Sequence, residues 1–425
     1  MKGLKLSLVV LAATLLAFGF SGMAYAFHDG GVANCESCHT MHNSIGDAAV
    51  VPGKTQFTGV SYLLKNSDQS STCLQCHQGN TLGATGSKNM FTQGAPSSIA
   101  GVGPVYYTPG GDFSWLTKSF QTSDSSGSRL GHNVIANDFN LKIDGTLNKS
   151  PGGNYLASNL TCISCHDPHP KARIDINYQI VYPSIGSKVP PIYKSGSYGD
   201  APTASEAVGT YRLLGGKNYV PKSYSGGPLF SYDPPVAVAP SNYNRKETTT
   251  DTRVAYGSGM SEWCSNCHAQ IHANNVGTNF IHPASDAAKL TAEVVANYNA
   301  YVKSGDLTNT VATSYTSLVP FEEGLVLNAG NITTLKNHAA GSTAGPQYGT
   351  ENVMCLSCHR AHASGFKYIT RWNMAEFITQ AGSYPSPTGT NTMTTVEYQA
   401  AMYDRPASAF ATFQRSLCNK CHVKD

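Results

Sequence analysis

Apolar residues form one long run in this chain, near its beginning, and otherwise occur in short groups. The run from Leu6 to Phe20 follows a short basic start and is followed by Ala24-Tyr25-Ala26, which has the small residues of a signal-peptidase site. We therefore expect residues 1–26 to be a secretory signal peptide and residues 27–425 to be the mature chain. An uncleaved membrane anchor is the alternative, and no later apolar run is long enough to span a bilayer.

Three later segments have the spacing of an amphipathic helix. The first begins at Ser285 or Asp286, ends at Gly305 and has Leu290, Val294, Tyr298 and Val302 on one face. The second runs from Thr370 to Gln380 and is closed by Gly382, and the third begins at Pro406 and carries Phe410, Phe413 and Leu417. Elsewhere Gly, Pro, Ser, Thr and Asn dominate, as in residues 95–111 and 183–240, which predicts irregular loops and little strand.

One short motif uses every cysteine in the chain. Cys-x-x-Cys-His occurs six times, at Cys35-Cys38-His39, Cys73-Cys76-His77, Cys162-Cys165-His166, Cys264-Cys267-His268, Cys355-Cys358-His359 and Cys418-Cys421-His422. A disulfide framework or a zinc site does not require a histidine after each pair, and no cysteine remains for a catalytic thiol. The motif is the attachment site of a c-type haem. In each motif both cysteines would form thioether bonds to the porphyrin, and the histidine would be the proximal iron ligand.

Six covalent haems supply the core that the irregular loops lack. Burial of a few hundred Å² of porphyrin at about 25 cal/mol per Å² contributes on the order of 10 kcal/mol per haem. We therefore predict a fold of mostly irregular coil with a few short α-helices and little strand, wrapped around a chain of six covalent haems. Since a distal ligand from one region is expected to serve a haem attached in another, residues 27–425 should form a single domain.

Eight further histidines are candidates for the distal position on the six irons. His42, His169 and His362 follow a proximal histidine by three residues, and His272 follows one by four, so that one helical turn would serve two neighbouring haems. His42 is too close in sequence to reach the far side of the haem that His39 ligates. The other candidates are His28, His132, His282 and His338. Two histidines are surplus, and His28 and His272 are favoured for that role.

Charge and ligation limit the possible functions. The formal charge of +3 falls to +1 when Lys2 and Lys5 leave with the signal peptide, and haem propionates make the loaded protein negative, which argues against nucleic acid as a partner. An iron with histidine on both sides has no open position for a substrate, so the pattern predicts an electron-transfer protein and no catalytic residues. A multihaem reductase is the competing class, although no attachment motif is altered to leave an iron site open.

The chain resembles the hexahaem outer-surface cytochromes of metal-reducing bacteria. The matching stretches extend from the signal peptide to the C-terminus and include residues 27–33, 38–44, 108–113, 165–169, 253–257, 259–264, 358–365 and 417–422. The sequence departs from that pattern between motifs two and three and around residues 313–350.

This resemblance implies bis-histidine ligation throughout, with parallel haem pairs alternating with T-shaped contacts. It also implies head-to-tail polymerisation into a conductive extracellular filament, in which His42 is donated to a haem of the neighbouring subunit. The expected partners are further copies of the chain, outer-membrane electron conduits, and extracellular acceptors such as Fe(III) oxides. A monomeric carrier in the periplasm or at the cell surface has the same haem pattern and stays open as the alternative.

Overall fold

Irregular backbone makes up most of the part of the chain that the structure describes. The computed structural model describes residues 35–40, 44–45, 48–49, 63–79, 88–93, 104–118, 129–184, 187–221, 230–240, 253–272, 284–308, 319–340, 345–346, 349–374, 377–385 and 395–422. Within these ranges the longest helix has 13 residues and the strands have two to four residues. The expected fold of coil with short helices and little strand is confirmed. The expected signal peptide, residues 1–26, lies outside the described residues.

The helices are short and scattered along the chain. The α-helices are α2 (Cys35–Cys38), α3 (Gln69–Leu74), α4 (Met260–His272), α5 (Ala292–Ala300), α6 (Ala329–Ala339), α7 (Cys355–Cys358) and α8 (Thr395–Ala401). The 3-10 helices are η2 (Phe113–Thr117), η3 (Asn137–Phe139), η4 (Ala157–Asn159), η5 (Cys162–Ser164), η6 (Tyr211–Leu213), η7 (Lys367–Ile369), η8 (Ala407–Ala409) and η9 (Leu417–Lys420). No helix in the described ranges has the length and apolarity needed to cross a membrane.

The strands form small, separate sheets. The antiparallel pairs are β1 (Ser44–Ile45) with β2 (Ala48–Ala49), β9 (Val236–Val238) with β10 (Ala255–Ser258), and β11 (Phe377–Thr379) with β12 (Gln414–Arg415), and the parallel pair is β3 (Gln78–Gly79) with β4 (Phe91–Thr92). A four-stranded sheet has the order β6 (Ile180–Val181), β5 (Arg173–Ile174), β8 (Ala207–Gly209) and β7 (Ile192–Lys194).

The first predicted helix exists, but it begins later than the sequence suggested. Helix α5 is capped by Thr291, whose hydroxyl accepts a hydrogen bond from the Val294 N–H, and Val295 and Tyr298 are buried. The capping position is therefore a threonine six residues after Ser285, which is consistent with the strong preference of Thr for N-cap positions.

The predictions of the other two helices are wrong. Within residues 370–374 and 377–380 the chain has no helix, and residues 377–379 form strand β11 instead. The segment after Pro406 makes a single 3-10 turn, becomes extended at Phe410 and then forms β12, which pairs with β11. Pairing between these two distant segments outweighs the local helical pattern of both.

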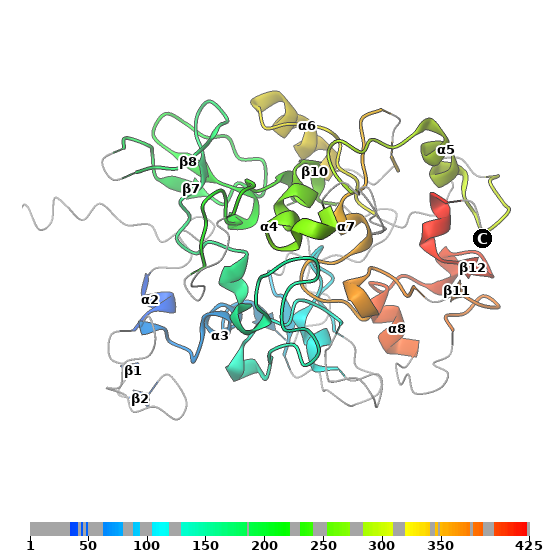
Figure 1. Ribbon diagram of the computed structural model, residues 1–425, viewed down its shortest axis with the longest axis horizontal. Helices are drawn as coiled ribbons and strands as arrows, with labels where there is room; N and C mark the ends of the chain where they lie inside the picture. Colours follow the sequence, from blue (N-terminus) through cyan, green and yellow to red (C-terminus); the bar gives the residue numbers. More distant parts are fainter. Residues whose placement is uncertain are drawn as a thin grey trace, which may run out of the picture.

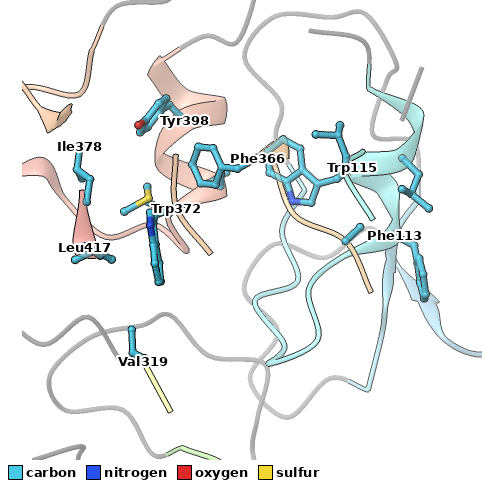
Figure 2. Close-up of a cluster of buried hydrophobic side chains, with 14 of the residues drawn as sticks. Phe113, Trp115, Val319, Phe366, Trp372, Ile378, Tyr398 and Leu417 are labelled. Atoms are coloured by element: carbon cyan, nitrogen blue, oxygen red, sulfur yellow. The ribbon is translucent and has the colours of Figure 1, made fainter. Parts of the chain in front are cut away.

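Buried apolar side chains from many segments form the largest cluster beside the last two attachment motifs. Figure 2 shows Trp115 and Phe366 together on one side of this cluster, and Trp372, Ile378 and Leu417 on the other. Phe366 meets Tyr398 edge to face with ring centres 5.4 Å apart. Cys358 and Cys421 pack against the same cluster.

The attachment motifs follow the long axis of the molecule. In Figure 1, α2 with the first motif lies at the left, α4 and α7 with the fourth and fifth motifs lie at the centre, and the C-terminal region with the sixth motif lies at the right. Helix α3 of the second motif packs against η5 of the third, and α4 packs against α7. The order of the motifs in space is therefore their order in the sequence.

Candidate haem sites

Each attachment motif folds as a helical turn or lies within one. The N–H of the histidine donates a hydrogen bond to the carbonyl oxygen of the first cysteine in five motifs, with N–O distances of 2.9 to 3.1 Å. The remaining one, motif four, lies within α4. This turn brings two side chains three residues apart onto one face, with the histidine beside them. All twelve cysteines are free thiols, and their sulfur atoms stand in for the thioether sulfurs of the haem-loaded protein.

Cysteines of successive motifs lie close together in a regular alternation. The first cysteines meet between motifs two and three, where Cys73 and Cys162 share a hydrogen bond, and between motifs four and five, where Cys264 and Cys355 do the same. The second cysteines are neighbours between motifs one and two, Cys38 with Cys76, and between motifs three and four, Cys165 with Cys267. Cys358 of motif five lies near both cysteines of motif six. The six sites thus form one unbranched series.

Three proximal histidines face a second imidazole across a gap of the size that an iron requires. The ring centres are 6.1 Å apart for His39 and His169, 6.4 Å for His166 and His362, and 6.0 Å for His268 and His132. Two metal–imidazole bonds of about 2.0 Å would place the coordinating nitrogens about 4 Å apart and the ring centres about 6 Å apart. The residues of these three sites therefore fit a haem iron with two histidine ligands.

Backbone carbonyl groups hold five of the candidate ligand rings in one orientation. Nδ1 lies 2.7 to 2.8 Å from a carbonyl oxygen in His77 (Lys88), His132 (Ala361), His166 (Arg212), His268 (Pro151) and His359 (Tyr368). Since a carbonyl oxygen can only accept, Nδ1 carries the proton and Nε2 keeps its lone pair for a metal. The fold therefore fixes the tautomer that iron ligation needs.

Burial favours the neutral form of four of the candidate ligands, His77, His132, His268 and His362. Desolvation lowers the pKa of His132 to about 4 and the pKa of His362 to about 3, with a further contribution from the neighbouring imidazole in each pair. Burial also lowers the pKa of His77 and of His268. A neutral imidazole is the form that binds a metal, so these sites do not have to release a proton at neutral pH.

Two distant segments meet to place a pair of these ligands. The His132 N–H donates to the carbonyl oxygen of His362 at 2.9 Å, and Gly131 forms a bridge with Ala363. His132 thereby faces His268, the proximal ring of the fourth motif. His362 faces His166, the proximal ring of the third motif. At His169 the turn is local, because the buried carboxylate of Asp167 accepts hydrogen bonds from the N–H groups of His169 and Lys171.

A later stretch of chain, which we call the return segment, crosses each odd-numbered motif. The return segments are residues 63–65 at motif one, 212–215 at motif three and 368–371 at motif five. Two backbone hydrogen bonds hold each return segment on its motif. In the first, the N–H of the residue after the proximal histidine donates to the carbonyl oxygen of Leu63, Leu213 or Ile369. In the second, the N–H of Lys65, Gly215 or Arg371 donates to the carbonyl oxygen of the second cysteine of the motif. The three odd motifs therefore share one local architecture that the sequence pattern did not indicate.

The return segments contain non-glycine residues with left-handed backbone. The φ values are +55° at Leu63, +52° at Arg212 and Leu213, +61° at Tyr368 and +59° at Ile369. Such conformations cost about 1–3 kcal/mol each and persist only where surrounding contacts impose them. Arg212 and Tyr368 supply the carbonyl groups that orient His166 and His359. The strain is thus located where the chain orients a proximal ligand, and no glycine marks these positions in the sequence.

Two of the eight candidate distal histidines face carboxylates. Nε2 of His272 lies 3.4 Å from Oε1 of Glu262, in a group of carboxylates that includes Asp286 and Glu322. Nδ1 of His338 lies 2.5 Å from Oε2 of Glu323, whose other oxygen lies 3.2 Å from Arg253. The remaining candidates, His28, His42 and His282, lie outside the described residues.

Comparison with known proteins gives a full-length match. The chain is 48% identical to the C-type cytochrome OmcS of Geobacter sulfurreducens over the whole length of both proteins. Two solved structures are similar at a TM-score of 0.83 and cover 94% of this chain and 100% of their own: an outer membrane cytochrome S filament (47% identical) and a cryo-EM structure of OmcS nanowires (48% identical), both from Geobacter sulfurreducens. No protein-family model matches the chain.

Proposed function

Since the chain belongs to the family of the c-type cytochrome OmcS, we propose that it carries electrons outside the cell along a series of six covalently attached haems. Bound haem supplies reversible one-electron chemistry. The residues supply attachment through the twelve cysteines and ligation through His39, His77, His166, His268, His359 and His422. The observation that carries the proposal is the unbroken order of the six motifs along the molecule, with cysteines of each motif beside those of the next.

The distal ligands of the odd-numbered haems follow a repeating rule. His169 lies three residues after the proximal ligand of motif three and faces that of motif one, and His362 stands in the same relation to motifs five and three. His42 occupies the equivalent position after His39, but the motif that it should serve would precede motif one. Another copy of the chain provides such a motif, and by the same rule it is motif five with its proximal His359.

His132 supplies the distal ligand of the fourth haem, and we assign the two remaining positions to His28 and His282. The ligand set then uses six of the eight candidates. His272 and His338 are the surplus pair, because Nε2 of His272 faces Glu262 and the half-exposed ring of His338 faces none of the proximal imidazoles in the described part of the chain. The sequence had favoured His28 and His272 as the surplus pair. In the present assignment His28 is a ligand and His338 is surplus.

Polymerisation into a conductive filament is the assembly that this ligand rule supports. The two similar solved structures are an outer membrane cytochrome filament and nanowires, and motifs one and six lie toward opposite ends of the long axis of this chain (Figure 1). A head-to-tail contact that does not close into a ring produces an open helical polymer. The haem series of one subunit would then continue into the next.

The filament proposal is tested by replacing the residue expected to join two subunits. His42→Ala should retain six haems, measured as pyridine haemochrome, but should abolish or weaken filaments in electron micrographs, because a distal ligand is lost from each subunit contact. His338→Ala is the matched control and should form normal filaments. Normal polymers from His42→Ala would contradict donation between subunits.

A monomeric carrier in the periplasm or at the cell surface remains the alternative function. It would use the same haem ligands, and imaging of the secreted material distinguishes the two. The expected signal peptide, residues 1–26, supports secretion, so we place the filament at the cell surface or beyond, with the periplasm as a transit compartment. Outer-membrane electron conduits are the proposed donors, and metal oxides such as Fe(III) oxides are the proposed acceptors. The three defined ring pairs leave no open position at their irons, and the proposed ligand set fills the other three, so reduction of a small substrate is disfavoured.

A further inference from the structure

The junctions between motifs two and three and between motifs four and five are built in the same way. In each, a helix of the earlier motif packs against the first turn of the later motif: α3 against η5, and α4 against α7. In each, the first cysteines of the two motifs are neighbours whose thiols interact, Cys73 with Cys162 and Cys264 with Cys355. In the loaded protein these sulfurs would be thioethers, so the residues of each junction would hold the edges of two haems.

One hydrogen bond is repeated at both junctions. The N–H of Cys162 donates to Oγ of Ser70 at 3.0 Å, and the N–H of Cys355 donates to Oγ of Ser261 at 3.1 Å. Both serines are fully buried and stand three residues before the first cysteine of their own motif. The bonded residues are 92 and 94 positions apart in the chain, so each serine joins two distant segments at the place where two haems approach.

The backbone N–H groups of Cys162 and Cys355 have no such acceptor within their own motifs. The first N–H groups of a helical turn lack intrahelical acceptors and are normally satisfied by the capping residue. At these two turns the serine directly before the second cysteine, Ser164 or Ser357, is used differently. Its hydroxyl oxygen accepts a hydrogen bond from the N–H of the residue before the first cysteine. The cysteine N–H is thus satisfied by the serine of the preceding motif, and the cap of one haem-binding turn is supplied by its neighbour.

We propose that Ser70 and Ser261 are positioning residues that set the separation and angle of haems two and three and of haems four and five. The inference rests on the proposed attachment of six haems and adds residues that bind no haem themselves. Electron transfer between two haems slows steeply with the distance between their edges. A hydroxyl group that links the backbone beside one thioether to the backbone beside the next therefore controls that distance directly.

Circular dichroism in the Soret region tests the proposal, because close haems at a fixed angle give an exciton couplet. The holoproteins Ser70→Ala and Ser261→Ala should retain six haems and lose part of the wild-type couplet. The double variant should lose more, since effects at separate junctions add. Photo-triggered electron injection should show slower equilibration between haems in the same variants.

Two kinds of control separate positioning from general packing. Ser265→Ala removes a buried hydroxyl from α4 that bonds only to Glu262 of the same helix among the contacts described, and it should keep the full couplet. Ser70→Thr and Ser261→Thr retain the hydroxyl group but add a methyl group at a fully buried position, so they should keep more of the couplet than the alanine variants.

Two results would overturn the proposal: an unchanged couplet in the double alanine variant, or fewer than six haems in either single alanine variant, which would assign the serines to folding or attachment. A wild-type chain with fewer than six haems would instead contradict the proposed function.

Discussion

At the scale of single residues, the central observation is the spacing of imidazole rings. Three pairs have ring centres 6.0 to 6.4 Å apart, although their members are 130 to 196 positions apart in the chain. In these pairs, backbone carbonyl groups accept a hydrogen bond from Nδ1 of the proximal rings of His166 and His268, which leaves Nε2 available for iron. In the folded protein, backbone contacts therefore fix the orientation of these ligand rings.

The pair His39 and His169 offers a direct test of ligation. His169→Ala should leave all six haems attached but make one iron high-spin and able to bind carbon monoxide, because the first haem loses its distal ligand. Optical and electron paramagnetic resonance spectra would measure this change. His272→Ala is the matched control and should keep six low-spin irons, since His272 faces Glu262. A fully low-spin spectrum from His169→Ala would contradict the pairing.

Left-handed residues in the return segments are a second residue-scale feature. Tyr368 has a φ of +61° and a side chain that is 61% exposed, so its replacement by glycine relieves strain and loses little packing. We expect Tyr368→Gly to raise the free energy of unfolding of the holoprotein by up to about 1 kcal/mol, measured with guanidinium. Tyr193→Gly, at an exposed position of strand β7 with ordinary backbone, should instead destabilise the protein. A destabilised Tyr368→Gly would show that the strain is not relieved there.

At the scale of elements, a carboxylate group joins the fourth and fifth motifs. Glu322 is fully buried, accepts from the Met260 N–H at the start of α4 and accepts from Asn352 before α7. Burial raises its pKa to about 8, and the neighbouring carboxylates of Asp286 and Glu262 contribute in the same direction. The folded state therefore favours the protonated form of Glu322.

This shift predicts how stability depends on pH. The pKa of Glu322 is about 8 in the folded protein against 4.5 for an ordinary glutamate, so its contribution is complete below about pH 4.5 and is lost as the pH rises toward 8. Glu322→Gln should flatten that part of the stability profile of the holoprotein, measured by guanidinium unfolding at several pH values. Glu293→Gln, on the exposed face of α5, should leave the profile unchanged. Identical profiles for wild type and Glu322→Gln would exclude this carboxyl as the source.

At the scale of the whole molecule, the fold depends on the haems that it surrounds. The described strands and helices are too short to enclose a core by themselves, and the apolar clusters border the attachment motifs. Figure 2 shows such a cluster, in which Leu417 directly precedes the sixth motif. The molecule is thus organised along a line of cofactors and not around a sheet or bundle.

Removal of haem should unfold the chain. Protein produced without the haem attachment machinery loses on the order of 10 kcal/mol of apolar burial per site. We expect it to be degraded rapidly in limited proteolysis and to lack a cooperative thermal transition, while the holoprotein resists the same protease. A folded, protease-resistant apoprotein would contradict this dependence.

The sequence by itself predicted the number and position of the haem attachment sites, because covalent attachment requires two cysteines and a histidine within one helical turn. It also indicated the scarcity of regular structure, which follows from the loop composition between motifs. Local periodicity failed at residues 370–380 and after Pro406, where pairing of β11 with β12 outweighed helical preference.

Only the tertiary structure decided which histidines face each other, which segments cross the odd motifs, and where Ser70 and Ser261 join two motifs. The ring pairs and the serine junctions depend on contacts between segments far apart in the chain, such as His132 with His362 or Cys162 with Ser70. A single sequence contains no local signal for such contacts, because their energy arises from burial and hydrogen bonding in the assembled molecule. The chemistry of each site is therefore local, and the order of the electron path is a property of the fold.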